Sequence, residues 1–180
     1  MSAPVTRHLA VLLALAAGTA ERLHAQAVPA PLDRAALEKM SRCDLDAVFA
    51  GGRAEGLPIG AGRGHILWVA GARYPKLRAN LQESVWKGKV FHADGRFENQ
   101  WVGTRAIKSR AALGESWLDG GPCVVLEYPA GTPVFSNARD ELREVAPGVW
   151  LGRYYDRCPC PKLNSYFVLE FPCGGGRGCR

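Results

Sequence analysis

The sequence predicts a mainly β protein: an antiparallel barrel or barrel-like sheet of about eight strands, with an N-terminal helix and one short internal helix. Two observations support this class. From Trp86 onward, apolar residues recur with a period of two in short runs that Gly, Pro and Asp residues separate. No long helical connection interrupts these runs, and parallel strands would need such crossovers.

The first 27 residues have the pattern of a secretory signal peptide. Arg7 and His8 precede an apolar run over 9–20, and the sequence AQA at 25–27 supplies the small residues of a cleavage site. The run is short for a membrane span, which needs roughly 20 residues. The alternative is a buried Ala/Leu helix of the folded domain. We therefore expect a periplasmic or secreted protein, with no stable membrane insertion after signal cleavage.

The rest of the chain is interpreted as a single β-rich domain over 28–172 and a Cys/Gly-rich tail over 173–180. With 180 residues, 47% of them hydrophobic and 22% charged, the chain suits one domain and is too apolar for disorder. Loss of the signal peptide lowers the formal net charge from +6 to +5. The basic residues are spread along the sequence, so nucleic acid is not an expected partner.

The mature domain begins with a helical pattern. Apolar residues at helical spacing predict a helix from Arg34 to Phe49, with Asp33 as its N-cap and Gly51-Gly52 as its stop signal. A second, short amphipathic helix is predicted over 74–85, where Leu and Val residues recur at steps of four.

Three glycines, at positions 60, 62 and 64, precede an apolar run over 66–69. A dinucleotide-binding loop follows a strand and opens a helix, with G-x-G-x-x-G spacing, whereas these glycines come before a predicted strand. We therefore expect a turn that leads into a strand, not a phosphate-binding loop.

Eight further runs alternate in the manner of strands. Turn signals such as Asp94-Gly95 and Pro147-Gly148 separate them. The runs are WKGKVF, RFENQWVG, TRAIKSR, ESWLDG, PCVVLEYP, ARDELREV, VWLGRYYD and NSYFVLEF.

All six cysteines follow the predicted cleavage site, and an even number in an oxidising compartment predicts disulfides. Four of them lie within 158–179, which suggests that the tail is stapled to the Cys-Pro-Cys turn. Zinc is the alternative there, but the C-x-C spacing does not suit it, and no metal or cofactor is expected. The other two either pair with each other or remain buried thiols. The disulfide candidates are Cys43, Cys123, Cys158, Cys160, Cys173 and Cys179.

The densest charges of the chain lie in the block ARDELREV. Because side chains alternate along a strand, Arg139, Glu141 and Arg143 share one face, and the acid-Leu-acid residues between them share the other. If the first face lines the barrel cavity, its two guanidinium groups suit a carboxylate or phosphate. If it faces outward, the charges form an exposed ladder of ion pairs or a structural network with loop groups such as Asp119.

These residues predict that the protein binds a small amphipathic or anionic ligand, such as a lipid or an organic acid, in a barrel cavity. The two arginines would form the polar end of the cavity and aromatic side chains its wall. Two alternatives stay open: an enzyme that uses the same cavity, with Asp119 or Glu141 as general base, and a structural or interaction module without a small ligand. The candidate ligand-binding residues are Arg139, Arg143, Glu141, Trp86, Trp117, Tyr128 and Asp119.

Several of these runs resemble the motifs of a family of uncharacterised bacterial proteins. The chain carries WKGKVF, ESWLDG and RDELREVAPGVWLG, in the order of the family motifs W-K-G-K-x-F, S-W-x-D-G and R-D-E-x-R-E-V-x-P-G-x-x-L-G. The resemblance covers roughly residues 45–171 and implies no activity. In architecture the chain is also similar to calycin-type barrels, lipocalins among them, which close an up-and-down sheet.

Overall fold

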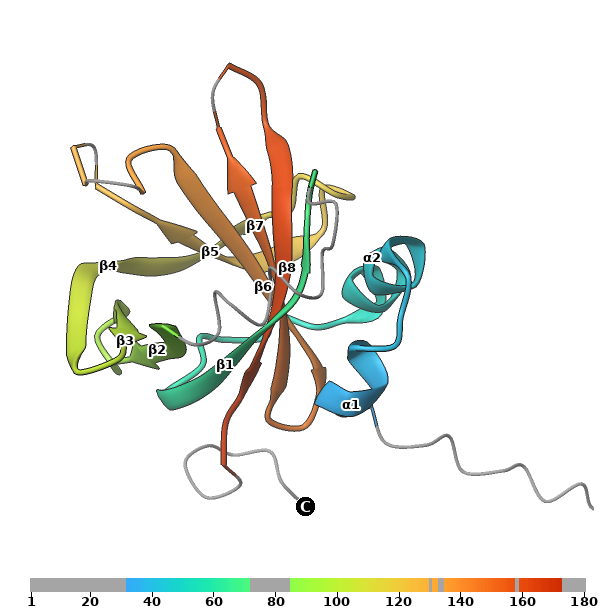
Figure 1. Ribbon diagram of the computed structural model, residues 1–180, viewed down its shortest axis with the longest axis horizontal. Helices are drawn as coiled ribbons and strands as arrows, with labels where there is room; N and C mark the ends of the chain where they lie inside the picture. The colour runs from blue at the N-terminus through green and yellow to red at the C-terminus, as the bar shows by residue number, and fades with distance from the viewer. Residues whose placement is uncertain (1–31, 72–84, 130, 133–134, 158, 173–180) are drawn as a thin grey trace, which may run out of the picture. The chain divides into compact units, whose positions relative to one another are not determined.

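Eight antiparallel strands follow one another around a closed barrel in the computed structural model of this protein (Figure 1). Each strand pairs with the next one along the chain, and β8 pairs back onto β1, which confirms the predicted class. The structure describes residues 32–71, 85–129, 131–132, 135–157 and 159–172. Its elements are α1 (Arg34–Leu37), α2 (Arg42–Gly51), β1 (Gly60–Val69), β2 (Trp86–Phe91), β3 (Arg96–Trp101), β4 (Thr104–Glu115), β5 (Pro122–Glu127), β6 (Ala138–Ala146), β7 (Val149–Asp156) and β8 (Lys162–Glu170).

The predicted N-terminal helix is two helices, α1 and α2, with a break between them. Asp33 caps α1 as expected, since its carboxylate accepts a hydrogen bond from the backbone N–H of Ala36 at 2.8 Å. Ser41 and Asp44 form a capping box at the start of α2, in which each side chain accepts from the other residue's backbone N–H. A capping box begins a helix, so the single continuous helix was wrong, although its start and its stop at Gly51 were right.

The run ESWLDG is not a strand. Strand β4 continues through Glu115, and residues 116–121 then turn back toward β5. Within this turn, the N–H groups of Leu118 and Gly120 donate to the hydroxyl and the carbonyl oxygen of Ser116. The strand predicted over 66–69 is the end of β1, which begins at Gly60, so the glycines expected to form a turn lie within a strand.

Two glycines of β1, Gly62 and Gly64, are explained by aromatic rings that lie against the backbone. A Cβ atom on Gly62 would come within 2.6 Å of the Phe171 ring, and one on Gly64 within 2.5 Å of the Trp86 ring. Only glycine permits so close an approach between a strand and a ring. Gly62 and Gly64 therefore serve packing, whereas Gly60 has open space around its Cβ position and a φ of +100°, which favours glycine.

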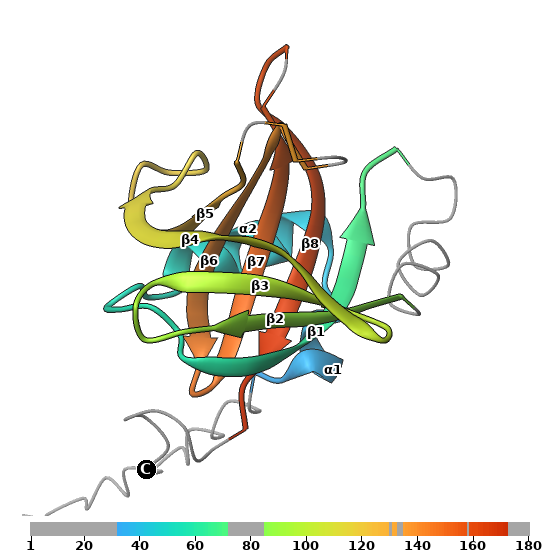
Figure 2. The ribbon, with the colours of Figure 1, turned by 90° about the vertical axis from the view of Figure 1, so that its left-hand side faces the viewer.

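Two hydrophobic clusters lie on opposite sides of the barrel wall. One fills the barrel interior and includes Phe97, Leu126 and Leu142. The other lies outside the wall and joins Phe49 of α2 to strand residues such as Leu151. In both views α2 lies alongside β6, β7 and β8, outside the barrel (Figures 1 and 2). This part of the wall is therefore buried on both faces, whereas β3 alternates between buried and more exposed positions.

Three sequence-based expectations fall partly or wholly outside the described residues: the signal peptide over 1–27, the internal helix over 74–85 and the tail over 173–180. Among the helices that the structure describes, none combines the length and the apolar character needed to cross a membrane.

Candidate functional site

Strand β6 carries the charged block whose orientation the sequence left open. Leu142 packs in the barrel interior, whereas the guanidinium carbon of Arg143 lies 4.8 Å from the ring centroid of Phe49 in α2. Because neighbouring side chains on a strand point to opposite faces, Arg139, Glu141 and Arg143 all face outward. The two arginines predicted to line the barrel cavity therefore lie on its outer wall.

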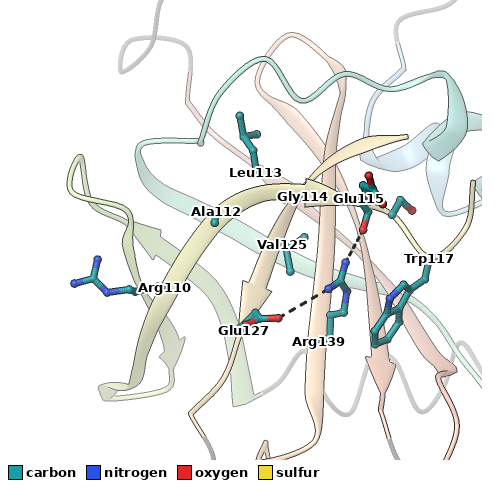
Figure 3. A pocket seen from close by; sticks show the side chains of 10 residues that line it. Arg110, Ala112, Leu113, Gly114, Glu115, Trp117, Val125, Glu127 and Arg139 are labelled. Atoms are coloured by element: carbon teal, nitrogen blue, oxygen red, sulfur yellow. Dashed lines mark hydrogen bonds and ion pairs between the residues drawn. The ribbon is translucent and has the colours of Figure 1, made fainter. Parts of the chain in front are cut away.

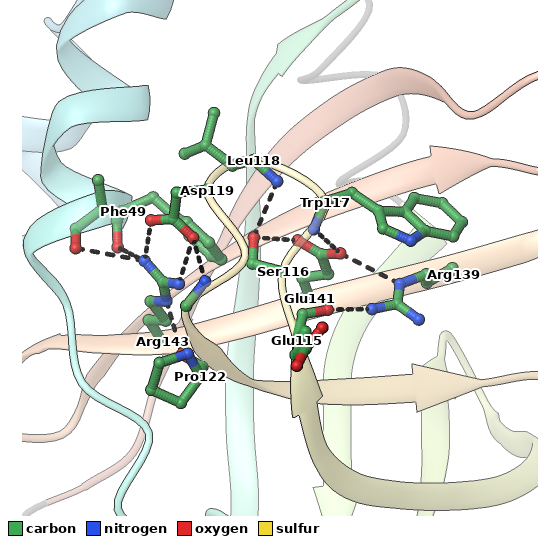
Figure 4. A network of polar contacts seen from close by, with 12 residues as sticks. Phe49, Glu115, Ser116, Trp117, Leu118, Asp119, Pro122, Arg139, Glu141 and Arg143 are labelled. Atoms are coloured by element: carbon green, nitrogen blue, oxygen red, sulfur yellow. Dashed lines mark hydrogen bonds and ion pairs between the residues drawn. The ribbon is translucent and has the colours of Figure 1, made fainter.

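Arg143 joins β6 to α2 and to the turn over 116–121 (Figure 4). Its Nη1 and Nη2 donate to the two carboxylate oxygens of Asp119 at 2.8 and 2.7 Å. Nη1 also donates to the carbonyl oxygens of Phe49 and Ala50, and Nε donates to that of Pro122. The side chain is only 2% exposed. This is a bidentate ion pair extended by three backbone contacts, which fixes the end of the helix on the barrel.

The same contact decides what Asp119 can do. Hydrogen bonds from Arg143, with a further one from the backbone N–H of Gly121, hold the pKa of Asp119 below its usual value. A carboxylate with a lowered pKa is a weak general base at neutral pH. The geometry therefore favours a structural ion pair for Asp119 over the catalytic role considered from the sequence.

Glu141 is fully buried between β6 and the turn (Figure 4). Its Oε2 accepts from the hydroxyl of Ser116 at 2.7 Å, and its Oε1 accepts from the backbone N–H of Trp117 at 2.8 Å. Nε of Arg139 donates to the same Oε1 at 3.1 Å. Both oxygens are thus engaged by the chain itself, so Glu141 shapes the turn and is not open to a substrate.

Arg139, whose side chain is 11% exposed, and the more exposed Trp117 form the outer end of this network. The guanidinium carbon lies 4.3 Å from the centroid of the Trp117 ring, which is a cation–π contact. Nη2 donates to the carbonyl oxygen of Glu115 at 2.6 Å, and Nη1 lies 3.9 Å from the carboxylate of Glu127. Nε and Nη2 therefore hold the guanidinium in place, while Nη1 has only a distant partner among the described residues.

A groove of about 560 Å³ runs along the outer face of β4 and β5 and ends at Arg139 and Trp117 (Figure 3). Trp117 is 41% exposed there. We call this pocket the outer groove. It is lined by Arg110, Ala112, Leu113, Gly114, Glu115, Ser116, Trp117, Val125, Glu127 and Arg139.

The barrel interior holds a second polar group, which the sequence did not single out. Nζ of Lys89 lies 2.9 Å from a carboxylate oxygen of Asp140 and donates to Asn99 Oδ1 and to the hydroxyl of Tyr128 at 2.8 and 2.7 Å. The hydroxyl of Tyr128 donates in turn to Asp140 at 2.8 Å. We call Lys89, Asn99, Tyr128 and Asp140 the barrel quartet.

The quartet is enclosed by aromatic rings. Nζ of Lys89 lies 5.4–5.6 Å from the ring centroids of Trp86, Phe97, Tyr128 and Phe167. Burial lowers the pKa of Lys89, and the nearby Asp140 carboxylate opposes this shift. The three protons of the ammonium group meet three acceptors, so the charge is compensated within the barrel.

Buried tyrosines make the stability of this barrel sensitive to alkaline pH. Burial raises the pKa of Tyr155 to about 12, and it also raises those of Tyr128 and Tyr154. Since these values exceed the unfolded value of about 10, the stability that they contribute is complete below pH ~10. It is lost as the pH rises through the folded values.

We therefore expect the urea concentration at the midpoint of unfolding to decrease as the pH is raised from about 10.5 to about 11.5. Over this interval Lys89 no longer makes the stability rise with pH. The Tyr155→Phe variant should lose less stability over this interval than the wild type. The expectation would be contradicted if the phenolate absorbance of the folded protein showed that all of its tyrosines ionise at about pH 10.

The candidate residues from the sequence divide between the two sides of the wall. Trp86 and Tyr128 lie inside, with the quartet, whereas Arg139, Arg143, Glu141, Asp119 and Trp117 lie outside. Sequence reasoning missed Lys89, Asn99 and Asp140. Each of these polar residues lies two positions along its strand from a buried apolar residue and therefore on the same face. The apolar partners are Phe91 for Lys89, Phe97 for Asn99 and Leu142 for Asp140, and this pattern could have identified them.

The sequence left two states open for Cys43 and Cys123, a disulfide between them or two buried thiols, and only Cys123 is a buried thiol. Cys43 and Cys123 do not pair: both are free, because α2 turns Cys43 toward solvent while β5 places Cys123 beneath the helix. Burial raises the pKa of Cys123 to about 12, so it behaves as a small hydrophobe. Cys160 is also free. Cys158, Cys173 and Cys179 lie outside the described residues. Within the described part of the chain, no cluster of three or more His, Cys, Asp or Glu residues could hold a metal.

Fold and site together define the class of this protein: a small up-and-down barrel of eight strands, with a charged network and an open groove on its outer wall. No family model matches the sequence, and no curated protein matches it. A solved structure of a protein from Thermomonospora curvata is similar, with a TM-score of 0.51, 19% sequence identity, and coverage of 76% of this chain and 92% of that chain. At this identity the likeness shows a shared barrel fold alone.

Proposed function

We propose that this protein is an exported binding protein that holds a small amphipathic anion in the outer groove. The observation that carries the proposal is the pairing of Arg139 with the half-exposed Trp117 at one end of a groove of about 560 Å³. This volume is typical of small-molecule sites. The bacterial motif family that the sequence resembles brings no activity of its own to this proposal.

The polar end of the site is Nη1 of Arg139. The other two nitrogens, Nε and Nη2, donate to Glu141 and to the carbonyl oxygen of Glu115, which holds the guanidinium in one orientation. The partner of Nη1 is Glu127, 62% exposed and 3.9 Å away. A ligand carboxylate, sulfonate or phosphate at hydrogen-bond distance would replace this weak contact with a stronger, charge-assisted one.

The rest of the groove suits an apolar or aromatic body. Ala112 and Val125 contribute small apolar surfaces between the two ends, and the Trp117 ring offers a face for stacking. By contrast, aromatic rings such as those of Trp86 and Phe97 pack in the barrel interior, and the donors of Lys89 are occupied by the quartet. The ligand site expected within the barrel is therefore proposed on its outer wall.

The test uses 8-anilinonaphthalene-1-sulfonate, an aromatic anion, as the probe in a fluorescence titration. Ala112→Phe fills the groove and Glu127→Gln removes the competing carboxylate. Both positions are exposed, and a glutamine at 127 can still accept the hydrogen bond that Arg157 donates at 3.1 Å. We expect Ala112→Phe to weaken binding about 10-fold to 100-fold, and Glu127→Gln to tighten it several-fold.

Arg53→Gln provides the matched control, because Arg53 is an exposed arginine outside the groove. The affinity of this variant for the probe should stay within twofold of that of the wild type. The proposal fails if Ala112→Phe and Glu127→Gln both bind the probe as the wild type does. If the two variants change probe binding as expected, native mass spectrometry of protein from its own host would identify the natural ligand by its mass.

A further inference from the structure

The outer face of β2, β3 and β4 is turned toward the viewer in Figure 2. Basic residues of these three consecutive strands gather on it. Register places Arg110 opposite Arg96, Lys108 opposite Glu98, and Arg105 opposite Gln100. The exposed cations that we call the basic face are Lys87, Arg96, Arg105, Lys108 and Arg110. The even spread of charge along the sequence thus becomes a cluster in the fold.

Acidic side chains balance this face only in part. Asp94 pairs with Arg96 at 2.6 Å, and Glu98 lies 3.8 Å from Lys108. Arg105 has no ion pair among the described residues, and Arg110 lies opposite Glu127 of β5 in the register. The five cations of the basic face thus meet three carboxylates, those of Asp94 in the turn before β3, Glu98 on β3 and Glu127 on β5, which leaves the face with a net positive charge.

Two valines project beside the basic face. Val85 is 50% exposed and Val102 is 62% exposed. They lie next to each other, since the N–H of Val102 donates to the carbonyl oxygen of Val85 at 2.9 Å. Lys87 follows Val85 by two residues, and Arg105 follows Val102 by three. An exposed aliphatic pair flanked by cations is the composition of a surface that meets the headgroup region of a lipid bilayer.

We propose that the basic face docks the protein peripherally on an anionic lipid surface, with Val85 and Val102 entering the headgroup layer. The valines favour lipid over a nucleic acid, because single-stranded nucleic acid is held by stacking on exposed aromatic rings. Among the described residues of these strands, the aromatic side chains are buried or half-buried. The basic face shares Arg110 with the outer groove, so the variants below are placed at other positions to test the two proposals separately.

The test measures cosedimentation with vesicles of phosphatidylcholine alone and of phosphatidylcholine with about 30% phosphatidylglycerol. Each basic residue near an anionic surface contributes about a fivefold factor, so the mixed vesicles should bind the protein roughly a hundredfold more tightly than the neutral ones. About 0.5 M salt should abolish the difference, because the Debye length then falls to a few ångströms.

The charge-reversal variant is Arg105→Glu with Lys108→Glu, two exposed residues outside the groove. It should lose at least a hundredfold in affinity for anionic vesicles. The matched control, Lys39→Glu with Lys162→Glu, changes the net charge equally but away from the basic face, and should lose no more than about twofold. Val102→Asp should lose about tenfold while probe binding in the outer groove is unchanged.

Three results would overturn the proposal. One is equal binding to neutral and anionic vesicles. Another is an equal loss of affinity in the control pair. The third is binding of labelled single-stranded DNA at least as tight as that of anionic vesicles, with Val102→Asp unaffected, which would assign the face to nucleic acid.

Discussion

Arg143→Met should lower the free energy of unfolding by about 3–5 kcal/mol. The substitution keeps an unbranched side chain over Phe49 but removes the cation that Asp119 and three carbonyl oxygens share. Two of these carbonyl groups, from Phe49 and Ala50, belong to the last turn of α2, where a cation also interacts favourably with the negative end of the helix dipole. Urea denaturation followed by circular dichroism would measure the loss.

Two further variants make this expectation specific. Arg143→Lys keeps the charge but cannot form the bidentate pair, so we expect a smaller loss of about 1–3 kcal/mol. Arg53→Met removes an exposed arginine and should change stability by less than about 0.5 kcal/mol. A loss below about 1 kcal/mol for Arg143→Met would show that the outer network does not hold α2 on the barrel.

Asp140→Leu should be comparably destabilising, by about 3–5 kcal/mol, because it leaves the Lys89 ammonium buried without its counter-charge. The double variant Lys89→Met with Asp140→Leu replaces the ion pair by apolar groups of similar size. It should recover most of the loss, since a buried ion pair contributes little net stability over a well-packed apolar pair. Thermal unfolding of the single and double variants measures the coupling.

The pH dependence of Asp140→Leu gives an independent check. Burial already lowers the pKa of Lys89, and removal of Asp140 takes away the interaction that opposes this shift. The folded pKa then lies well below the unfolded value of about 10.4, so the unfolded state binds more protons between the two values. The deficit relative to the wild type should therefore shrink as the pH rises toward about 10. A deficit that does not change with pH would mean that Lys89 is not the buried charge responsible.

Charged residues thus serve two separate purposes in this barrel. Inside, the quartet compensates one lysine within a shell of aromatic rings. Outside, the network of Arg143, Asp119 and Glu141 shapes the turn that brings Trp117 over Arg139. The outer groove depends on this turn, so its ligand site is supported by residues that do not themselves line it.

Several elements follow from local chemistry and were predictable. Asp33 caps α1 because its carboxylate reaches a free N–H, and the pair Pro147-Gly148 forms the turn between β6 and β7. The break before α2 was equally local, since Ser41 and Asp44 have capping-box spacing, but the apolar spacing across it suggested one helix. The ESWLDG segment alternates like a strand, yet hydrogen bonds to Ser116 and Glu141 turn it back.

The sequence by itself determined the class of the protein, because a period of two with turn residues between short runs admits an antiparallel sheet and little else. It also determined which residues of β6 share a face. Only the tertiary structure decided which of those faces looks into the barrel, since alternation is symmetric and both faces of β6 carry charges. Helix α2 sets the orientation of β6 because it covers the outer wall. There Arg143 packs on Phe49 of the helix and pairs with Asp119 of the turn, while Leu142 and Asp140 point into the interior.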